Sequence, residues 1–297
     1  MSPTIRLPFI AVVAWTVRAV RTSGAKFLPA AAILACTAFG ATLPNPAQAA
    51  GALDRIHANG VIRIANTQSS PPWSFLNEQN KPAGYDVDMA QEVARRLGVP
   101  KVEFVADSFK NFVAGLKTDK YDLVMNDLTP TAERMLQVDF SAPYGVEDFR
   151  IFVRQDNKDI HGDKDLAGKR IGVTTGSSNE SWSRAHLPQA TIQTYENGSL
   201  IFADLGIGRI DAVIISHFGG LRYATERKLP IKEVGEPLTY QLSAAALRKD
   251  EPELREAVSK AIAEMKADGT IEKLGQKWVG KEYDMVGSIA RAEAEVK

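Results

Sequence analysis

The sequence predicts an α/β fold in which mainly parallel strands alternate with helices. Short apolar runs such as Val61–Ala65 and Asp211–Ile215 recur along the chain, and segments with helical periodicity separate them. Several of these runs end in hydroxyl-rich turns, which in open α/β sheets surround the ligand. At 297 residues, the chain is long enough for two lobes with separate cores.

The first 49 residues predict a secretory signal peptide. They contain four basic and no acidic residues. The apolar run Phe27–Leu43 is followed by a cleavage-site pattern of small residues that ends at Ala49. Lys26 and Pro44 leave that run too short to span a membrane. We therefore expect cleavage near Ala49 and a periplasmic protein. The only cysteine, Cys36, lies in this segment, and a loose likeness to a lipoprotein cleavage box leaves its lipidation open.

The composition of the remaining chain argues against several classes of function. Without the four basic residues of the leader it has 32 basic and 36 acidic residues, a net charge near −4, which disfavours nucleic acid and anionic membranes as partners. Its histidines lack metal-ligand spacing and no cysteine accompanies them, so we expect no metal and no cofactor. Spacing suggests no Ser/His/Asp catalytic set.

The first half of the mature chain predicts three strands and two helices. Apolar, largely β-branched runs place the strands at Val61–Ala65, Val102–Val105 and Leu123–Met125. One-sided apolar spacing places the helices at Asp86–Gly98, where the glycine is a natural stop, and Phe109–Lys117. The two prolines of Asn66–Trp73 keep that polar segment a loop. An extended segment runs from Phe140 to Val153.

The second half repeats the alternation. Strands are expected at Arg170–Val173, Thr191–Tyr195 and Asp211–Ile215, and helices around Trp182 and at Leu200–Leu205. The chain then crosses back through Gly235–Ser243 to Ala244–Leu247. A last long helix runs from about Pro252 to Gly269.

The stretch Val124–Arg134 (V-M-N-D-L-T-P-T-A-E-R) suggests an anion site at a helix start. We expect Thr129 as the N-cap, Pro130 as the first helical residue, and Arg134 as a guanidinium able to hold a carboxylate. The alternative is an ordinary capped surface helix. A similar hydroxyl-rich turn, Thr174–Asn179, follows a later strand, and two such turns facing one another would surround a small polar ligand.

Eight motifs resemble those of the polar-amino-acid-binding periplasmic proteins of ABC importers, in the order typical of that family. They are P-P-W-S-F (71–75), G-Y-D-V-D-M-A (84–90), L-K-T-D-K-Y-D-L (116–123), T-P-T-A-E-R (129–134), D-F-S-A-P-Y (139–144), G-K-R-I-G-V-T-T-G-S-S (168–178), G-R-I-D-A-V (208–213) and D-G-T-I-E-K-L-G-Q-K-W-V-G (268–280). The resemblance implies a two-lobed, type II (Venus-flytrap) fold.

The same resemblance implies a domain division. Residues 1–49 are the signal peptide, 50–145 and 239–280 the first lobe, 146–238 the second lobe, and 281–297 a C-terminal tail. The two hinge crossings fall near Tyr144–Asp148 and Thr239–Ser243.

The resemblance also implies site residues. Arg134 matches the arginine that holds the ligand's α-carboxylate, and Thr129 matches a hydroxyl beside it. Ser177 and Ser178, with Thr174 in the same turn, complete that grip from the second lobe. Phe109 matches an aromatic wall of the pocket.

Some expected site residues depart from the family. Thr67, Ser70 and Ser216 stand where relatives commonly carry an aspartate, an aromatic residue and the aspartate that binds the α-ammonium. Asn126 and Asp127 replace two small residues. Asp127 is therefore expected either to contact a cationic ligand group or to cap its own turn, and a ligand without an ammonium stays open.

Among other conspicuous side chains, Trp73, Trp182 and His217 are expected mainly in structural roles. The implied function is capture of an amino acid or a similar carboxylate between closing lobes, followed by delivery to the importer's permease in the inner membrane. The implied state is a monomer without catalytic activity. The alternative is an enzyme similar to cyclohexadienyl dehydratases, with Glu180 or Asp127 as the acid.

Overall fold

The computed structural model describes residues 51–226 and 228–295. The predicted signal peptide and the lipidation expected at Cys36 therefore lie outside the described residues. Within the described ranges, helices are too short or too polar to cross a membrane.

A mixed sheet forms the centre of the molecule, in the strand order β5-β1-β6-β11-β7-β10-β8-β9. Its members are β1 (Val61–Asn66), β5 (Lys101–Ala106), β6 (Leu123–Val124), β7 (Asp139–Arg154), β8 (Arg170–Thr174), β9 (Thr191–Tyr195), β10 (Ala212–Ser216) and β11 (Ile231–Leu247). A small antiparallel sheet follows β1, with strands β2 (Ser69–Ser70), β3 (Ser74–Leu76) and β4 (Pro82–Ala83).

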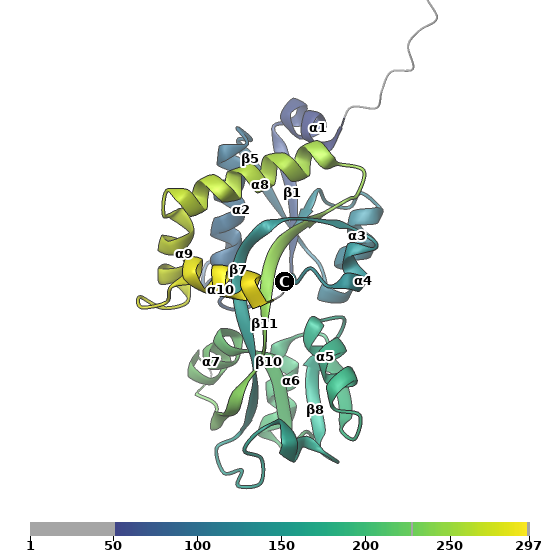
Figure 1. The fold of residues 1–297 in the computed structure, drawn as a ribbon, viewed down its shortest axis with the longest axis vertical. Coiled ribbons are helices and arrows are strands. Elements are labelled where there is room, and N and C mark those ends of the chain that lie inside the picture. The colour runs from purple at the N-terminus through teal and green to yellow at the C-terminus, as the bar shows by residue number, and fades with distance from the viewer. Residues whose placement is uncertain (1–50, 227, 296–297) are drawn as a thin grey trace, which may run out of the picture. The chain divides into compact units, whose positions relative to one another are not determined.

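The large sheet divides the fold into two lobes. In the first lobe, β1 pairs in parallel with β5 and β6, and in the second, β8 pairs in parallel with β9 and β10. The long strands β7 and β11 pair antiparallel with each other and run from one lobe into the other (Figure 1). This arrangement confirms the predicted two-lobed α/β fold, with more antiparallel pairing at its centre than the sequence suggested.

Helices cover the sheet in both lobes (Figure 1). They are α1 (Ala52–Asn59), α2 (Tyr85–Arg96), α3 (Phe112–Lys117), α4 (Ala132–Met135), α5 (Ser178–His186), α6 (Gly198–Gly206), α7 (His217–Glu226), α8 (Pro252–Ala267), α9 (Thr270–Trp278) and α10 (Met285–Glu295), with 3₁₀ turns at Phe109–Asn111 and Asp163–Leu166. Among the described residues, buried apolar side chains form two clusters in each lobe, as expected for a sheet covered on both faces.

The prediction for the helix start at Thr129 was wrong by two residues. The cap of α4 is Thr131, whose hydroxyl accepts a hydrogen bond from the Arg134 amide at 3.3 Å. Thr129 and Pro130 lie in the preceding loop. Either threonine of the T-P-T pattern could cap the helix with its hydroxyl. Burial of Leu128 against the first-lobe core determines which of the two does so.

The segment expected as a C-terminal tail contains the helix α10. Its residues Met285, Ile289 and Ala292 are buried and join the largest apolar cluster of the first lobe. Their four- and three-residue spacing is a helical signal that was present in the sequence.

Candidate functional site

A cavity lies between the two lobes, at the carboxyl ends of their parallel strands. About 70 Å³ is open to the centre of a water molecule, and the space measures about 660 Å³ when its solvent-exposed mouth is included. Loops after β1 and β6 form one wall, and turns after β8, β9 and β10 form the other. This is the position expected for a ligand in an open α/β sheet.

Nine of the eleven expected site residues line this cavity. They are Thr67, Ser70, Phe109, Asn126, Asp127, Thr174, Ser177, Ser178 and Ser216. Thr129 and Arg134 lie beside it without lining it, and Arg134 faces a second hollow at the mouth between the lobes.

Arg134 bridges the two lobes. Its guanidinium donates hydrogen bonds to the Thr129 carbonyl at 2.8 Å and, across the cleft, to the Gly176 carbonyl at 2.9 Å. It also lies over the ring of Phe109, 5.4 Å from the centroid, and so stands directly behind a cavity wall. Burial lowers its pKa to about 10, which keeps it charged at neutral pH.

Other contacts between the lobes show that the cleft is closed. The hydroxyls of Thr129 and Ser178 lie 3.3 Å apart, Tyr223 donates to the Ser69 carbonyl at 2.7 Å, and Lys110 pairs with Glu196 at 2.8 Å. These contacts join loops that no strand pairing holds together, so they depend on lobe closure.

The second-lobe turn is built as a capped helix start. The Ser177 hydroxyl accepts a hydrogen bond from the Glu180 amide at 3.2 Å and donates to the Thr174 carbonyl at 2.7 Å. Glu180 bonds back to the Gly176 amide at 2.8 Å and pairs with Arg184. Glu180 thus bonds within its own turn, and of the two candidate acids of the enzymatic alternative Asp127 lines the cavity while Glu180 does not.

Asn126 organises the first-lobe wall. Its side-chain oxygen accepts hydrogen bonds from the Thr67 amide at 2.7 Å and from the Ser74 hydroxyl at 2.5 Å, and the Thr67 and Ser70 hydroxyls lie 2.8 Å apart. With that oxygen occupied, the donor end of the amide remains for other partners.

Asp127 supplies a carboxyl group to the cavity. It has a left-handed backbone (φ 47°), a conformation that aspartate tolerates better than most residues, and its side chain accepts a hydrogen bond from Ser243. Burial and the neighbouring Asp86 raise its pKa to about 8, against the opposing influence of Ser243 and Arg134. Among the described lining residues only Asp127 and Glu196 are ionisable acids and none is Lys, Arg or His, so the cavity favours a cationic group.

Trp73 is both a core residue and a lining residue. It is 3% exposed, stacks edge-on against Tyr85, and its indole N–H has no hydrogen-bond partner. Trp182 packs against the second-lobe core. His217 pairs with Glu233 at 2.7 Å and lies outside the cavity lining, in keeping with a structural role.

Several lining residues were not anticipated from the sequence. They are Ser69, Pro71, Trp73, Phe149, Asn179, Glu196, Asn197, Gly198, Ile215, Gly219 and Tyr223. One group had a recognisable signal. Glu196–Gly198 follows β9 as a third polar turn, and Asn197 caps α6 by accepting from the Leu200 amide at 3.2 Å. Phe149, Gly219 and Tyr223 come from within β7 and α7. The remaining residues come from the chain around β2 or from near the ends of β10 and α5.

Comparisons with known proteins agree with this architecture. The chain is 32% identical to the L-cystine-binding protein TcyJ of Escherichia coli (strain K12) over 231 residues, covering 77% of this chain and 86% of TcyJ. It superimposes on an ancestral arginine-binding protein bound to arginine with a TM-score of 0.72 at 36% identity, covering 74% of this chain and 99% of the other.

A third comparison bears on the enzymatic alternative. The ancestral amino acid-binding protein AncCDT-1, a precursor of cyclohexadienyl dehydratase, matches with a TM-score of 0.71 at 34% identity, covering 76% of this chain and 98% of that one.

Residues 62–281 match the family model of the bacterial extracellular solute-binding proteins, family 3. The chain therefore belongs to the bacterial extracellular solute-binding proteins, family 3.

Proposed function

We propose that this protein is a periplasmic, monomeric and non-catalytic receptor that captures an amino acid between its lobes and delivers it to an ABC importer. The observation that carries the proposal is the closed cavity, with a carboxyl group at Asp127 and hydroxyls from both lobes around it. Relatives named for cystine and arginine binding support the ligand class.

The two ends of the amino acid would have different partners. The ammonium group would lie at Asp127, which takes over from the aspartate that the family commonly has at Ser216. The carboxylate would lie toward Ser177, Ser178 and Arg134. To reach Arg134 it would replace the Gly176 carbonyl as a partner of the guanidinium, which a carboxylate can do with two parallel hydrogen bonds.

Closure would be the signal that the importer reads. We propose that the lobes move about the β7–β11 pair at Tyr144–Asp148 and Thr239–Ser243, which lie beside each other in that pair. A ligand that contacts both walls stabilises only the closed form, so binding shifts the population toward it.

A thermal-shift screen tests the ligand class. The probes are L-arginine, L-glutamine, L-cystine and glutaramate, which is L-glutamine without its ammonium group. We expect at least one amino acid, but not glutaramate, to raise the melting temperature by mass action. A shift with glutaramate and none with the amino acids would contradict the proposal and indicate an organic-acid receptor.

A second candidate function rests on Asp127. A buried carboxyl with a pKa of about 8 is protonated at neutral pH and can act as a general acid, which dehydration of prephenate or arogenate requires. We propose that the protein has no such activity, because the relatives that it resembles over most of its length are named as binding proteins. Incubation with prephenate and arogenate, followed by detection of the aromatic product, distinguishes the two functions.

A further inference from the structure

Two fully buried carboxyl groups lie close to Asp127 without lining the cavity. Asp86 is in the first turn of α2, and Glu147 is in β7. Both side chains are 0% exposed. The Tyr144 hydroxyl donates to the Asp86 carboxylate at 2.8 Å, and the nearby Asp127 backbone amide lowers the pKa of that carboxyl. Three carboxyls from separate elements therefore share one small region.

The hydrogen bonding of these groups is incomplete. One oxygen of Glu147 accepts from the Phe218 amide at 2.9 Å, but the other oxygen, like the second oxygen of Asp86, has no hydrogen-bond partner. A buried carboxylate with an unpartnered oxygen is costly, and protonation removes most of that cost.

The surrounding groups do not supply enough positive charge to keep all three carboxyls ionised. The ionisable side chains that face the cluster are Tyr85, Arg134, Tyr144, Asp148, Glu272 and Tyr283. Of these only Arg134 is cationic, and its influence on Asp127 is smaller than that of burial and of Asp86. Arg150 is committed to Asp148 and Glu233.

Burial raises the pKa of each carboxyl, and a neighbouring carboxylate raises it further for Asp127 and Glu147. The pKa of Asp86 rises to about 7, mainly through burial, and that of Asp127 to about 8. Burial and then the charge of Asp127 raise the pKa of Glu147 well above its usual value. At neutral pH the empty cluster therefore retains protons.

Strand geometry places Glu147 behind the cavity wall. Side chains two residues apart on a strand point to the same face of the sheet. The Glu147 side chain therefore lies on the same face of β7 as that of Phe149. Phe149 lines the cavity and pairs with Ser216, which also lines it. The unpartnered Glu147 oxygen thus lies behind the end of the cavity that Asp127 and Ser216 line.

We propose that Asp86 and Glu147 form with Asp127 a carboxyl cluster that holds a proton in the empty site, and that the ammonium group of the bound solute takes the place of that proton. This inference rests on the proposed function, since it requires a ligand with an ammonium group. It makes Glu147 a positioning residue, which acts on the ligand through Asp127.

Proton exchange makes affinity depend on pH. Releasing one proton per ligand strengthens binding about tenfold for each pH unit, up to the pKa of the empty cluster. Affinity should therefore rise by up to about 100-fold between pH 6 and pH 8.

Titration calorimetry of the full-length mature protein tests the inference, with L-arginine, L-glutamine and L-cystine as probes. Enthalpies measured at pH 7 in phosphate and in Tris, whose protonation enthalpies differ, give the number of protons released. We expect a value close to one for the probes that bind. Binding with no proton release and a flat pH profile would overturn the inference and leave the proposed function intact, whereas no binding by any probe would overturn both.

Substitutions assign the effect to the cluster. In Glu147→Gln, the cluster loses a carboxyl group that can release a proton, so fewer protons leave on binding and the slope of log Kd against pH should fall to about half or less. A purely structural role would instead weaken binding equally at every pH. Asp86→Asn should act in the same direction.

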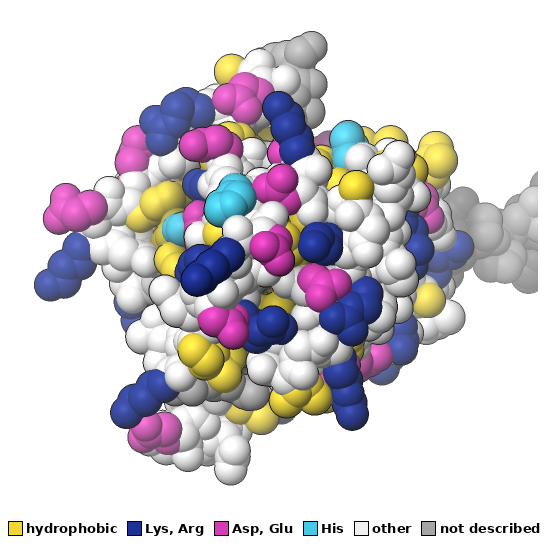
Figure 2. All heavy atoms as spheres, turned by 90° about the horizontal axis from the view of Figure 1, so that it is seen from below, with side chains coloured by type: hydrophobic (Ala, Val, Ile, Leu, Met, Phe, Trp, Pro, Cys, Tyr) yellow, Lys and Arg dark blue, Asp and Glu magenta, His cyan; other side chains and the backbone are white. Residues whose placement is uncertain are grey.

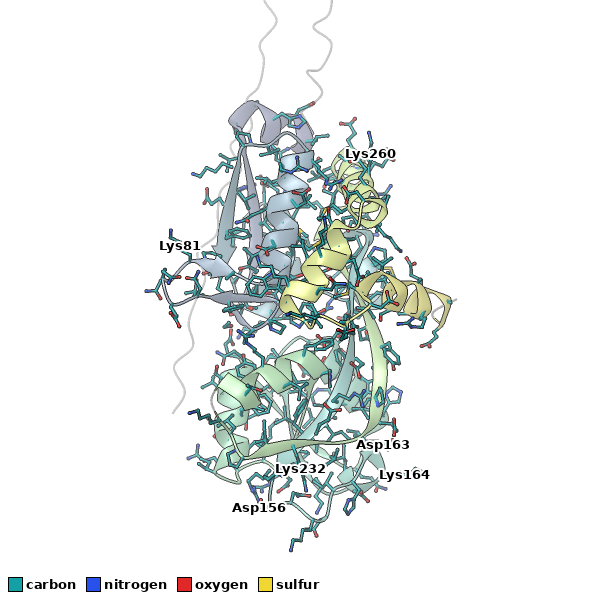
Figure 3. All side chains as sticks on the ribbon, turned by 90° about the vertical axis from the view of Figure 1, so that its left-hand side faces the viewer. Lys81, Asp156, Asp163, Lys164, Lys232 and Lys260 are labelled. Atoms are coloured by element: carbon teal, nitrogen blue, oxygen red, sulfur yellow. The ribbon has the colours of Figure 1, made fainter. Side chains whose placement is uncertain are left out.

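The matched control is Asp156→Asn. Asp156 lies at the far end of the second lobe with its side chain 78% exposed (Figure 3). The ligand affinity of the Asp156→Asn protein should depend on pH in the same way as that of the unsubstituted protein. A Glu147→Gln protein that retains the full slope would refute the role of Glu147.

Discussion

Replacing Arg134 tests how closure and ligand binding are connected. In Arg134→Ala, two hydrogen bonds from a charged donor are lost, and they act on different equilibria. The bond to the Thr129 carbonyl lies within the first lobe and supports its stability, whereas the bond to the Gly176 carbonyl forms only when the lobes meet. The second bond therefore contributes to ligand affinity even if Arg134 never touches the ligand.

The size of the effect follows from these contacts. A hydrogen bond from a charged donor contributes about 1.5–3 kcal/mol, so loss of the Gly176 bond should weaken binding about tenfold to 150-fold. If the guanidinium instead holds the ligand carboxylate with two parallel hydrogen bonds, in place of the Gly176 carbonyl, the loss should exceed the upper end of this range. Arg134→Lys should fall between, because an ammonium group cannot present the two parallel donors of a guanidinium.

Calorimetry with L-arginine and L-argininamide separates the two roles. Argininamide lacks the carboxylate. If Arg134 contacts the carboxylate of arginine, the Arg134→Ala protein should no longer bind arginine more tightly than argininamide. Arg184→Ala is the matched control, because this exposed arginine lines the same mouth of the cleft and only pairs with Glu180. Affinity within twofold of the unsubstituted protein in Arg134→Ala would refute the reasoning.

Two further substitutions test features of the fold. Gly176→Ala should weaken ligand binding about tenfold in calorimetry, because Gly176 has φ +76° and an added Cβ would lie 2.8 Å from the Lys110 Cα across the cleft. Gly168→Ala, with φ +72° and open space around it, should lose stability but keep its affinity, and equal affinities in both variants would contradict the steric argument. Ile289→Ala should lower the unfolding free energy by about 2–4 kcal/mol in urea titration, because Ile289 is fully buried in α10. The exposed Leu136→Ala should change it little, and an unchanged Ile289→Ala protein would show that α10 does not contribute to the core.

Elements with strong local patterns could be predicted from the sequence. The parallel strands of both lobes were found within a few residues because each is a short apolar run between polar turns, whereas the short strands β2, β3 and β4 were not predicted. Local patterns were weaker where tertiary packing decides at which residue a helix begins. The start of α4 is an example, because either Thr129 or Thr131 could have capped it. The predicted extended segment Phe140–Val153 matches β7 to within one residue at each end, whereas β11 begins four residues before the predicted crossing at Gly235.

The site was predictable where polar residues follow strand ends. That rule selected the turns that contain Asp127 and Ser177, which line the cavity, and it would have selected Asn197 had it been applied to the turn after β9. Thr67 was named only through the family resemblance. The rule could not find Glu147, whose importance depends on which elements bury it. The local hint was the acidic pair Glu147-Asp148 in the middle of a strand.

The surface is less informative than the cleft. On the face in Figure 2, Lys and Arg side chains alternate with Asp and Glu, without a broad area of one charge. Such mixing agrees with the near-neutral composition and offers no electrostatic footprint for a polyanion.

The course of β7 and β11 also determines the order in which the lobes can fold. The second lobe is a continuous segment that lies between these two strands. The first lobe is completed only when the chain returns, since Val124 of β6 pairs with Ala246 of β11. Contacts so distant in sequence form slowly, because the loop between them must close first. The second lobe can thus become native before the first, which needs β11 and the helices α8, α9 and α10 that follow it.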